Sequence, residues 1–416
     1  MNIPLHRPEL IQKTPDYLQT ITSLAHPEHV LNKKGYLTAQ LTSYDLERKK
    51  RCLHCSKVLK KKDKIHWAKS QAGQDASSGI SRPVEILTVA EPEDAEGGAS
   101  LETRAEGKAQ GKGKPPKDLC RYHTGAVRAK HWTCCGGFVA VPGCVESAQH
   151  TPRVYAHNEL ELEWQLHPTP SPSPNMQGRR RGGRVPAIKP VDAVAIDCEM
   201  GTSEYGDTEL IRLTIIDYFT GQVLLDKLVW PDCPMQHFNT RFSGITRQMM
   251  NDARRRRTCL FGRASARAEM WKFIGQDTVV VGHGSNNDFT SLRWIHPRIV
   301  DTFLIEEPFA TVERAKFEAA MEKMEEEKKA LKERGEPWDH LTPPPAVQGS
   351  SLKALTDTRL KRKIQMAGRG HDSLEDAWAC RDLLHWHVVN RLDRQSLPAP
   401  TQVVVDEIAI AQRGHW

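Results

Sequence analysis

The stretch VDAVAIDCEMG, residues 191–201, decides the fold of the C-terminal half of this 416-residue chain. Its run of Val, Ala and Ile is typical of a short buried strand, and the run ends on two carboxylates, Asp197 and Glu199. In an extended backbone, residues i and i+2 project from the same face of the strand. The pair is therefore predicted to present two oxygen ligands to one site. An Asp-x-Glu pair after a strand is more often only solvent-exposed, so the interpretation depends on what the rest of the chain supplies.

Further strands and helices follow this stretch in a regular order. Strands are predicted for LIRLTIIDYF (210–219), GQVLLDKLVW (221–230) and VVVGHG (279–284). Helical spacing marks 244–257, 264–274, SLKALTDTRL (351–360) and SLEDAWACRDLLHWHVVNRL (373–392). Strands first, then strands interleaved with helices, predict an α/β fold with a mixed sheet flanked by helices.

Three more polar residues recur at the ends of these elements. Asp288 follows the VVVGHG strand, where the plain alternative is a helix N-cap. His371 and Asp376 lie in GHDSLEDA, and the capping-box spacing of Asp372 and Glu375 predicts that a helix begins close to Asp372. His371 would then stand at the mouth of that helix, with Asp376 one turn inside it.

The order Asp-x-Glu, Asp, His-x4-Asp across one α/β domain resembles the DEDDh exonuclease superfamily. The chain resembles more closely the eukaryotic RNA exonuclease (Rex) family over roughly residues 191–390, through the motifs AIDCEMG, TRFSGIT, VVVGHGSNNDF, HPRIVDT, SLKAL and HDSLEDA. The resemblance implies an RNase H-like fold and 3′→5′ hydrolysis of RNA. It departs from a compact member of the family in the charged run at about 306–348, which is predicted to be a solvated helical insertion. A coiled-coil partner site is the functional alternative for this run.

The resemblance also implies roles for individual residues. Asp197 would bridge two divalent cations, Glu199 and Asp376 would complete the ligands of one, and Asp288 would hold the other. Hard oxygen ligands favour Mg²⁺ or Mn²⁺. His371 is the expected general base. The expected substrate contacts are Met200, Gly201 and Phe289, with Phe242 as a further stacking candidate; either phenylalanine is as easily explained as core.

A second cluster of chemistry lies in the N-terminal half. Close Cys and His pairs suit tetrahedral zinc, and CRYHTG followed by WTCC is similar to the cysteine- and histidine-rich CHORD domain. Eight candidate ligands are enough for one or two structural ions, with His131 as a possible substitute, and their partition stays open: Cys52, Cys55, Cys120, His123, Cys134, Cys135, Cys144 and His150. The alternative is a set of reduced cysteines that fill a small core.

Composition shifts suggest where these modules begin and end. The expected divisions are an arm at 1–50, a Cys/His module at 51–157 with a disordered insertion at about 68–118, a Pro/Arg/Gly-rich linker at 158–190, an exonuclease domain at 191–395 and a tail at 396–416.

Charge and hydropathy narrow the possible partners. Residues 1–190 hold 29 Lys and Arg against 19 Asp and Glu, whereas residues 191–416 hold 30 against 33, so a polyanion should be attracted to the N-terminal half. No apolar run of membrane-spanning length occurs. The basic runs at 57–64 and 178–184 favour the nucleus. The expected partner is the 3′ end of single-stranded RNA. Single-stranded DNA as substrate, and a zinc-dependent protein-interaction scaffold with an incidental nuclease fold, remain alternatives.

Overall fold

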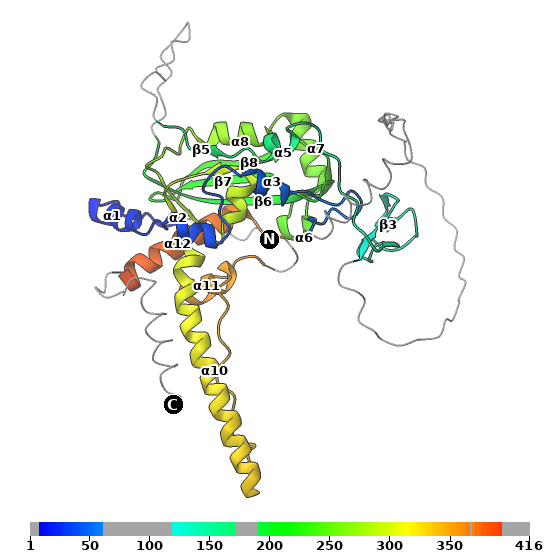
Figure 1. Ribbon diagram of the computed structural model, residues 1–416. Coiled ribbons are helices and arrows are strands. Elements are labelled where there is room, and N and C mark those ends of the chain that lie inside the picture. Colours follow the sequence, from blue (N-terminus) through cyan, green and yellow to red (C-terminus); the bar gives the residue numbers. More distant parts are fainter. Residues whose placement is uncertain (1–7, 61–118, 172–189, 367, 369, 393–416) are drawn as a thin grey trace, which may run out of the picture. The chain divides into compact units, whose positions relative to one another are not determined.

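The computed structural model describes residues 8–60, 119–171, 190–366, 368 and 370–392 (Figure 1). The chain divides into two compact units. The sheet unit comprises residues 1–43 and 159–416, and the Cys/His unit comprises residues 44–158. The predicted insertion at 68–118, the basic run at 178–184 and the tail at 396–416 lie outside the described residues.

Within the described residues, the sheet unit is built on a mixed sheet of seven strands with the order β10-β8-β7-β6-β11-β13, and β9 pairs with β6. β6 is antiparallel to β7 and parallel to β11, and β8 is antiparallel to β7. The strand bounds are β6 (Ala193–Ser203), β7 (Thr208–Asp217), β8 (Val223–Trp230), β9 (Met235–His237), β10 (Leu260–Phe261), β11 (Val279–Gly282) and β13 (Ile299–Asp301). The predicted α/β class with a mixed sheet is confirmed.

The two faces of the sheet carry separate apolar layers, and β6 contributes to both because its side chains alternate. Val194 and Ile196 join the layer that contains α8 (Gly262–Met270) and α9 (Asn286–Ser291). Ala193 and Ala195 join the layer that contains α12 (Ser373–His387). Figure 1 shows α8 and α12 on opposite sides of the sheet. Asp197 and Glu199 continue the row of Ala193 and Ala195, so both carboxylates face the side on which α12 packs.

Among the remaining helices of this half, those at 247–256, 262–270 and 352–359 match predicted helices with shifted bounds, whereas the short helices at 240–243 and 286–291 are not predicted from the sequence. The remaining helices are α6 (Thr240–Ser243), α7 (Arg247–Arg256), α8 (Gly262–Met270), α9 (Asn286–Ser291), α11 (Leu352–Arg359) and the π-helical turn η1 (Val388–Leu392) that continues α12. Thr246 caps α7 by accepting a hydrogen bond from Met249 N, and Ser351 caps α11 in the same way through Ala354 N. Among the described helices, none has the length and hydropathy of a membrane span.

The segment predicted to be an N-terminal arm is part of the sheet unit as far as Ser43. It carries α1 (Pro15–Ser23) and α2 (Glu28–Lys33), and four of its apolar side chains are buried: Ile11, Ile21, Leu31 and Tyr36. Tyr36 donates a hydrogen bond to Asp301 Oδ2 at 2.5 Å and lies 3.0 Å from the Ser285 hydroxyl. These four apolar residues are too widely spaced along a polar stretch to predict a core contribution from the sequence.

The predicted linker at 158–190 also differs from the structure in its described first part, residues 159–171. It forms α5 (Glu159–Glu163) and β5 (His167–Pro168), which pairs with β12 (Trp294–Ile295). Trp164 and Leu166 are buried, and the Arg293 guanidinium lies 3.8 Å from the centre of the Trp164 ring. The backbone of Leu166 also forms two hydrogen bonds with the side-chain amide of Gln40, so residues 159–171 lie next to the N-terminal segment. Burial of two large side chains holds this part against the sheet unit.

The charged run forms the long helix α10 (Thr302–Arg334), which projects from the sheet (Figure 1). Asp301 caps its start and Gly335, at φ 69°, ends it. The two ends of this insertion lie close together, because His283 contacts both Thr302 Oγ1 at 2.9 Å and the Ser350 carbonyl at 3.1 Å. An insertion whose ends meet disturbs the rest of the fold little.

The Cys/His unit is small. Its elements are α3 (Ser43–Glu47), the ribbon of β1 (Cys120–Tyr122) with β4 (Val145–Ser147), and the ribbon of β2 (Val127–Arg128) with β3 (His131–Trp132). Among its described residues, the buried apolar side chains are few, namely Cys52, Leu59 and Cys120. So small a core needs additional cross-links or metal ions to be stable.

Candidate active site and Cys/His metal centres

The site lies where β6 extends beyond the part that pairs with β11. The β11 residues paired with β6 are Val279 to Val281, which match Ala193 to Ala195, and β9 pairs with β6 only from Thr202 on, so between these points the backbone of β6 has no strand neighbour on that edge. Asp288 fills part of this gap by accepting a hydrogen bond from Cys198 N at 3.1 Å. Ser285, not Asp288, stands at the N-cap position of α9. The plain N-cap interpretation of Asp288 is therefore wrong, and its carboxylate lies beside Asp197 and Glu199.

α12 brings Asp376 to the same place. Its N-cap is Asp372, which accepts a hydrogen bond from Leu374 N at 3.1 Å, so the predicted start is confirmed. Glu375 does not close a capping box, because its Oε2 accepts a hydrogen bond from Gln365 N at 2.9 Å instead. Asp376, in the first turn, is 3% exposed and points into the protein.

The four carboxyls lie in a poorly solvated, mutually repulsive group. Burial raises the pKa of Glu199 to about 8 and the pKa of Asp288 and of Asp376 to about 7. The pKa of Asp197 is raised well above its usual range by burial and then by the charges of Asp288, Asp376 and Glu199. Keeping four carboxylates ionised here requires a positive charge among them.

Two buried oxygen atoms in this group are unsatisfied. Glu199 Oε1 and Asp376 Oδ1 have no hydrogen-bond partner among the described residues. A buried polar atom without a partner is costly unless a cation coordinates it. Oxygen donors only, with a net negative charge, suit Mg²⁺ or Mn²⁺. The residues present therefore fit the divalent cations that the sequence predicts.

His371 stands at the open side of this group. Its side chain is 44% exposed, and its Nδ1 lies 3.8 Å from Asp376 Oδ2. Partial burial and the charge of Lys353 lower the pKa of His371, so the imidazole is neutral at pH 7. Its backbone N donates to the carbonyl of Phe242 at 2.5 Å, which fixes the loop before α12 against α6. A neutral, accessible imidazole beside a carboxylate is suited to accept a proton.

Arg212 is a residue of this site that the sequence analysis missed. It pairs with Glu199 across β6 and β7 and lowers the pKa of that carboxyl against the effect of burial. Its guanidinium binds both oxygens of Asp226, at 2.8 and 3.0 Å, and Oδ1 of Asp372 at 2.9 Å. Arg212 thus joins two strands to the start of α12. The sequence feature that could have identified Arg212 is its position as a charged residue inside an otherwise apolar strand.

Gln365 is the second missed residue. Its side-chain amide donates to Asp376 Oδ2 at 3.0 Å, and Lys353 Nζ donates to its carbonyl at 2.8 Å. With the bond from Gln365 N to Glu375, three hydrogen bonds fasten this loop to α11 and α12. A glutamine in a polar loop carries no sequence signal for such a role.

The predicted substrate contacts fare differently. Phe289 is 2% exposed and stacks on Trp294 with 4.6 Å between the ring centres, so its side chain is packed in the core. Gly201 lies in tight packing, since a Cβ there would lie 2.5 Å from Met235 Cε and 3.0 Å from the His237 carbonyl oxygen. Met200 is partly buried and its carbonyl accepts a hydrogen bond from Asn239 at 3.1 Å. Phe242 is 61% exposed. Of these, Phe242 has the most accessible side chain.

The eight predicted zinc ligands form two separate groups in the Cys/His unit. Cys52, Cys55, Cys120 and His150 make one group, and His123, Cys134, Cys135 and Cys144 make the other, each with ligand atoms within 4.8 Å of one another. His131 belongs to neither group and contacts the carbonyl of Ala129 at 2.9 Å. The β1–β4 ribbon explains this partition. Cys120 and His150 lie at one end of the ribbon, and His123 and Cys144 lie at the other.

The sulfur separations favour a metal ion over a disulfide. Cys52 Sγ and Cys120 Sγ are 3.7 Å apart, and Cys134 Sγ and Cys144 Sγ are 3.6 Å apart. Thiolates about 2.3 Å from a tetrahedral ion stand about 3.8 Å from one another, whereas a disulfide requires about 2.05 Å. Burial raises the pKa of Cys52, but hydrogen bonds from the backbone of Cys55 and His54 and from His150 bring it down to about 7. Both groups therefore have the geometry of a zinc site.

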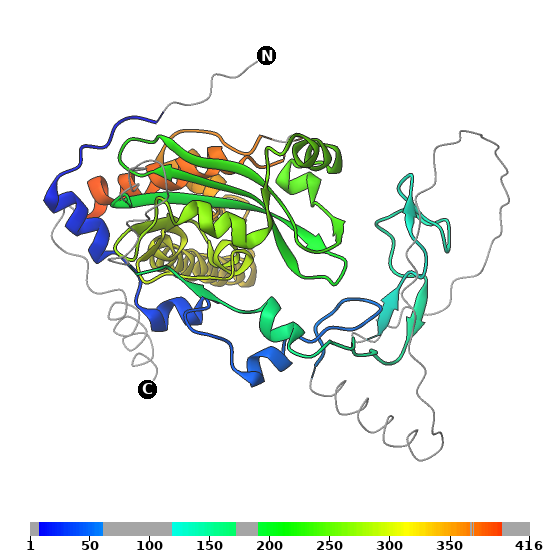
Figure 2. The ribbon, with the colours of Figure 1, turned by 90° about the horizontal axis from the view of Figure 1, so that it is seen from above.

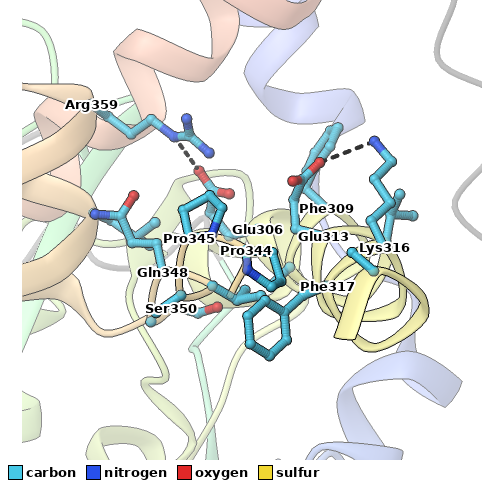
Figure 3. Close-up of a pocket in the computed structure, with 17 residues that line it drawn as sticks. Glu306, Phe309, Glu313, Lys316, Phe317, Pro344, Pro345, Gln348, Ser350 and Arg359 are labelled. Atoms are coloured by element: carbon cyan, nitrogen blue, oxygen red, sulfur yellow. Dashed lines mark hydrogen bonds and ion pairs between the residues drawn. The ribbon is translucent and has the colours of Figure 1, made fainter. Parts of the chain in front are cut away.

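A cavity of about 700 Å³ lies in the sheet unit, between α10 and residues 344–350 (Figure 3). Phe309, Phe317 and Pro345 contribute apolar walls, and Arg359 pairs with Glu306 at 3.3 Å. None of the five predicted catalytic residues lines it. A partner for the charged helix stays a prediction.

Comparison with known proteins gives the relatives of the chain. No family model matches it. It is 32% identical over 240 residues to an uncharacterized exonuclease of Schizosaccharomyces pombe, covering 56% of this chain and 31% of the relative. It is 28% identical over 275 residues to RNA exonuclease 3 of Candida albicans, covering 66% and 55%. Both of these relatives are named as exonucleases.

A solved structure, the pseudoubiquitin hydrolase-RNA exonuclease module of Saccharomyces cerevisiae Pan2, matches with a TM-score of 0.35 and 23% identity over 55% of this chain and 33% of that one. The chain thus spans about a third to a half of the length of the proteins it matches.

Proposed function

We propose that this protein is a metal-dependent 3′→5′ exonuclease of RNA. The observation that carries the proposal is the group of four carboxyls with two unsatisfied buried oxygens, Glu199 Oε1 and Asp376 Oδ1, next to an accessible imidazole. The similarity to an RNA exonuclease over 66% of the chain supports RNA as the substrate class.

The reaction is hydrolysis of the last phosphodiester bond of a strand. A water molecule attacks phosphorus, the bond from phosphorus to the 3′ oxygen of the preceding nucleotide breaks, and that oxygen takes a proton. The products are a nucleoside 5′-monophosphate and a strand one nucleotide shorter. Two divalent cations, when bound, would supply charge neutralisation at the phosphate and acidify the water.

The side chains of the chain have distinct tasks in this reaction. Asp197, Glu199, Asp288 and Asp376 would hold the cations. His371 accepts the proton of the attacking water. Its imidazole is neutral at pH 7, is partly exposed and lies next to the carboxylate of Asp376. Arg212 and Gln365 position the start of α12 and Asp376.

The test is a parallel digestion of single-stranded RNA and DNA of the same sequence, each labelled at the 5′ end, with Mg²⁺. The proposal expects a ladder of RNA shortened one nucleotide at a time, release of nucleoside 5′-monophosphates and no cleavage when the 3′ end is blocked. Internal cuts in a circular RNA would overturn the direction. Preferential digestion of DNA would support the alternative substrate, and no hydrolysis of either strand would support a scaffold.

We propose in addition that the Cys/His unit binds two structural zinc ions and helps to hold long RNA. The two ligand groups at the ends of the β1–β4 ribbon support the first part. The described residues of this unit, 44–60 and 119–158, hold ten Lys and Arg against three Asp and Glu, which supports the second part. A protein partner for the unit is the alternative, and it predicts no effect of the unit on RNA affinity. The nucleus is the proposed location, on the basic runs alone.

A further inference from the structure

Six arginines lie between residues 241 and 257, against one acidic residue, Asp252. All six side chains are exposed, and they belong to α6, to α7 and to its C-cap: Arg241, Arg247, Arg254, Arg255, Arg256 and Arg257. Among the described residues, only Arg255 forms a salt bridge, with Asp252. We call this set the arginine strip.

The fold alone does not require such a charge. Basic residues in the last turn of α7 interact favourably with the helix dipole, but Arg247 occupies its first turn, where the dipole is unfavourable. Four consecutive arginines also repel one another. An exposed excess of this kind, with almost no acidic neighbours, is typical of a surface that binds a polyanion.

The strand register places the strip beside the carboxyl group. Glu199 pairs with Arg212, and Arg212 pairs with Leu228, so all three side chains point to the same face of the sheet. Trp230 lies two residues beyond Leu228 and therefore on that face as well. The Arg254 guanidinium lies 4.5 Å from the centre of its ring. β8 is two strands from β6, about 10 Å away.

The other end of the strip adjoins His371. The carbonyl of Phe242, in α6, accepts the backbone hydrogen bond of His371, and the Arg241 guanidinium lies 5.8 Å from the centre of the Phe242 ring. From there α7 runs about 15 Å, since a helix rises about 1.5 Å per residue. The strip thus leads from the proposed general base toward the end of β8 on the active face.

Three of the guanidinium groups are partly ordered by aromatic rings. Besides Arg241 on Phe242 and Arg254 on Trp230, Arg247 lies 5.3 Å from the centre of the Phe238 ring. A stacked guanidinium keeps its N–H edges in solvent and loses less freedom when it binds a phosphate. Phe242, 61% exposed, offers a ring on which a base can stack.

We propose that the arginine strip binds the phosphodiester backbone of the substrate strand on the 5′ side of the nucleotide being removed. This inference rests on the proposed function and names the path of the single-stranded RNA. On this inference, part of the RNA-binding surface lies within the sheet unit. The overall charge of the sequence, in contrast, predicts RNA binding by the N-terminal half.

The test compares two triple variants of the full chain. Arg254→Gln/Arg256→Gln/Arg257→Gln removes three charges from the strip, and Arg314→Gln/Lys323→Gln/Lys329→Gln removes three exposed charges from α10. Affinity for a fluorescent 20-nucleotide single-stranded RNA is measured against salt with Mg²⁺ present, in an Asp197→Asn background that prevents digestion. Cleavage of a dinucleotide is measured without that background change.

The strip variant is expected to show a slope of log affinity against log salt that is shallower by about 2, since each phosphate contact on a single strand contributes about 0.7. Its cleavage of the dinucleotide should equal that of the parent, because a dinucleotide does not reach the strip. The α10 variant should keep the parental slope. An unchanged slope in the strip variant, or an equal change in both variants, would overturn the inference. Failure of the parent to cleave the dinucleotide would instead count against the proposed function.

Discussion

The side-chain amide of Gln365 donates a hydrogen bond to Oδ2 of Asp376 at 3.0 Å, while Oδ1 of the same carboxylate is buried and has no partner among the described residues. The glutamine therefore selects the oxygen that remains available to a cation. Residues that orient metal ligands typically contribute about 10- to 100-fold to metal affinity.

Gln365→Ala is expected to weaken the binding of Mn²⁺, measured by titration calorimetry without RNA, by about 10-fold or more. The Mg²⁺ concentration for half-maximal cleavage should rise in parallel, and saturating Mg²⁺ should restore most of the maximal rate. Gln276→Ala is the control, because among the described residues its amide donates to the Thr169 carbonyl and the Ser171 hydroxyl and to none of the four carboxyls. Unchanged Mn²⁺ affinity in Gln365→Ala would show that the contact has no role in metal binding.

Asp197→Asn should reduce cleavage in Mg²⁺ by about a thousandfold or more, since several kcal/mol of transition-state stabilisation depend on the cations. The protein should remain folded, and without Mg²⁺ it should melt at a higher temperature than the parent, because one of four mutually repelling carboxyls is removed. Thermal melting and the RNA ladder assay check both parts. Parental activity in this variant would sink the catalytic assignment.

The stability of the metal-free protein should depend on pH with a defined sign. Asp288 and Asp376 have a pKa of about 7 in the folded chain, above the ordinary value of about 4, so the folded state binds more protons than the unfolded state between these values. The free energy of unfolding should therefore fall as pH rises from about 4 to about 8.

Adding Mg²⁺ should remove much of this pH dependence, because the cation compensates the ionised carboxylates. Denaturant titrations at several pH values, with and without Mg²⁺, measure the free energy of unfolding. In Asp376→Asn, the free energy of unfolding without metal should depend less on pH. A metal-free stability that rises across this window would contradict the electrostatic account.

The boundary between the two units predicts which truncation preserves the enzyme. Replacing residues 44–158 with a Gly/Ser linker of about ten residues should keep the fold and dinucleotide cleavage, since Gln40 and Leu166 already lie side by side. A fragment of residues 185–416 should not fold stably, because it lacks Ile21, Leu31, Tyr36 and Trp164 from the core. Circular dichroism and thermal melting separate these outcomes.

The linker variant should also bind long RNA less tightly, with a shallower salt slope, if the basic Cys/His unit holds RNA. Equal affinity and slope in the linker variant and the full chain would remove that role from the unit and leave the catalytic assignment untouched.

Zinc content should follow the two ligand groups. The parent is expected to carry two zinc ions per chain, and Cys55→Ser and Cys144→Ser should each lose one, because each belongs to a single group. Cys233→Ser, outside both groups, should keep two. Elemental analysis of purified protein measures this. Dinucleotide cleavage should be equal in all four proteins, since the ligands lie in the other unit. Two ions in Cys144→Ser would refute the second centre.

The sequence by itself determined the strand that carries Asp197 and Glu199, the start of α12 at Asp372, and the order of the four carboxyls along the chain, because these depend on alternation and capping within a few residues. It also marked all eight Cys and His residues that the structure gathers in two groups, since close pairs are visible at short range.

Only the tertiary structure decided which ligands share a centre, because the β1–β4 ribbon separates Cys120 from His123 although they are three residues apart. It alone showed that Phe289 is core and that Gln365 holds Asp376. It also moved residues 8–43 and 159–171 into the sheet unit. Each of these depends on contacts between residues far apart in the chain, whose side chains show no local period. The site is completed by the packing of residues that are far apart in the sequence, which a local pattern cannot predict.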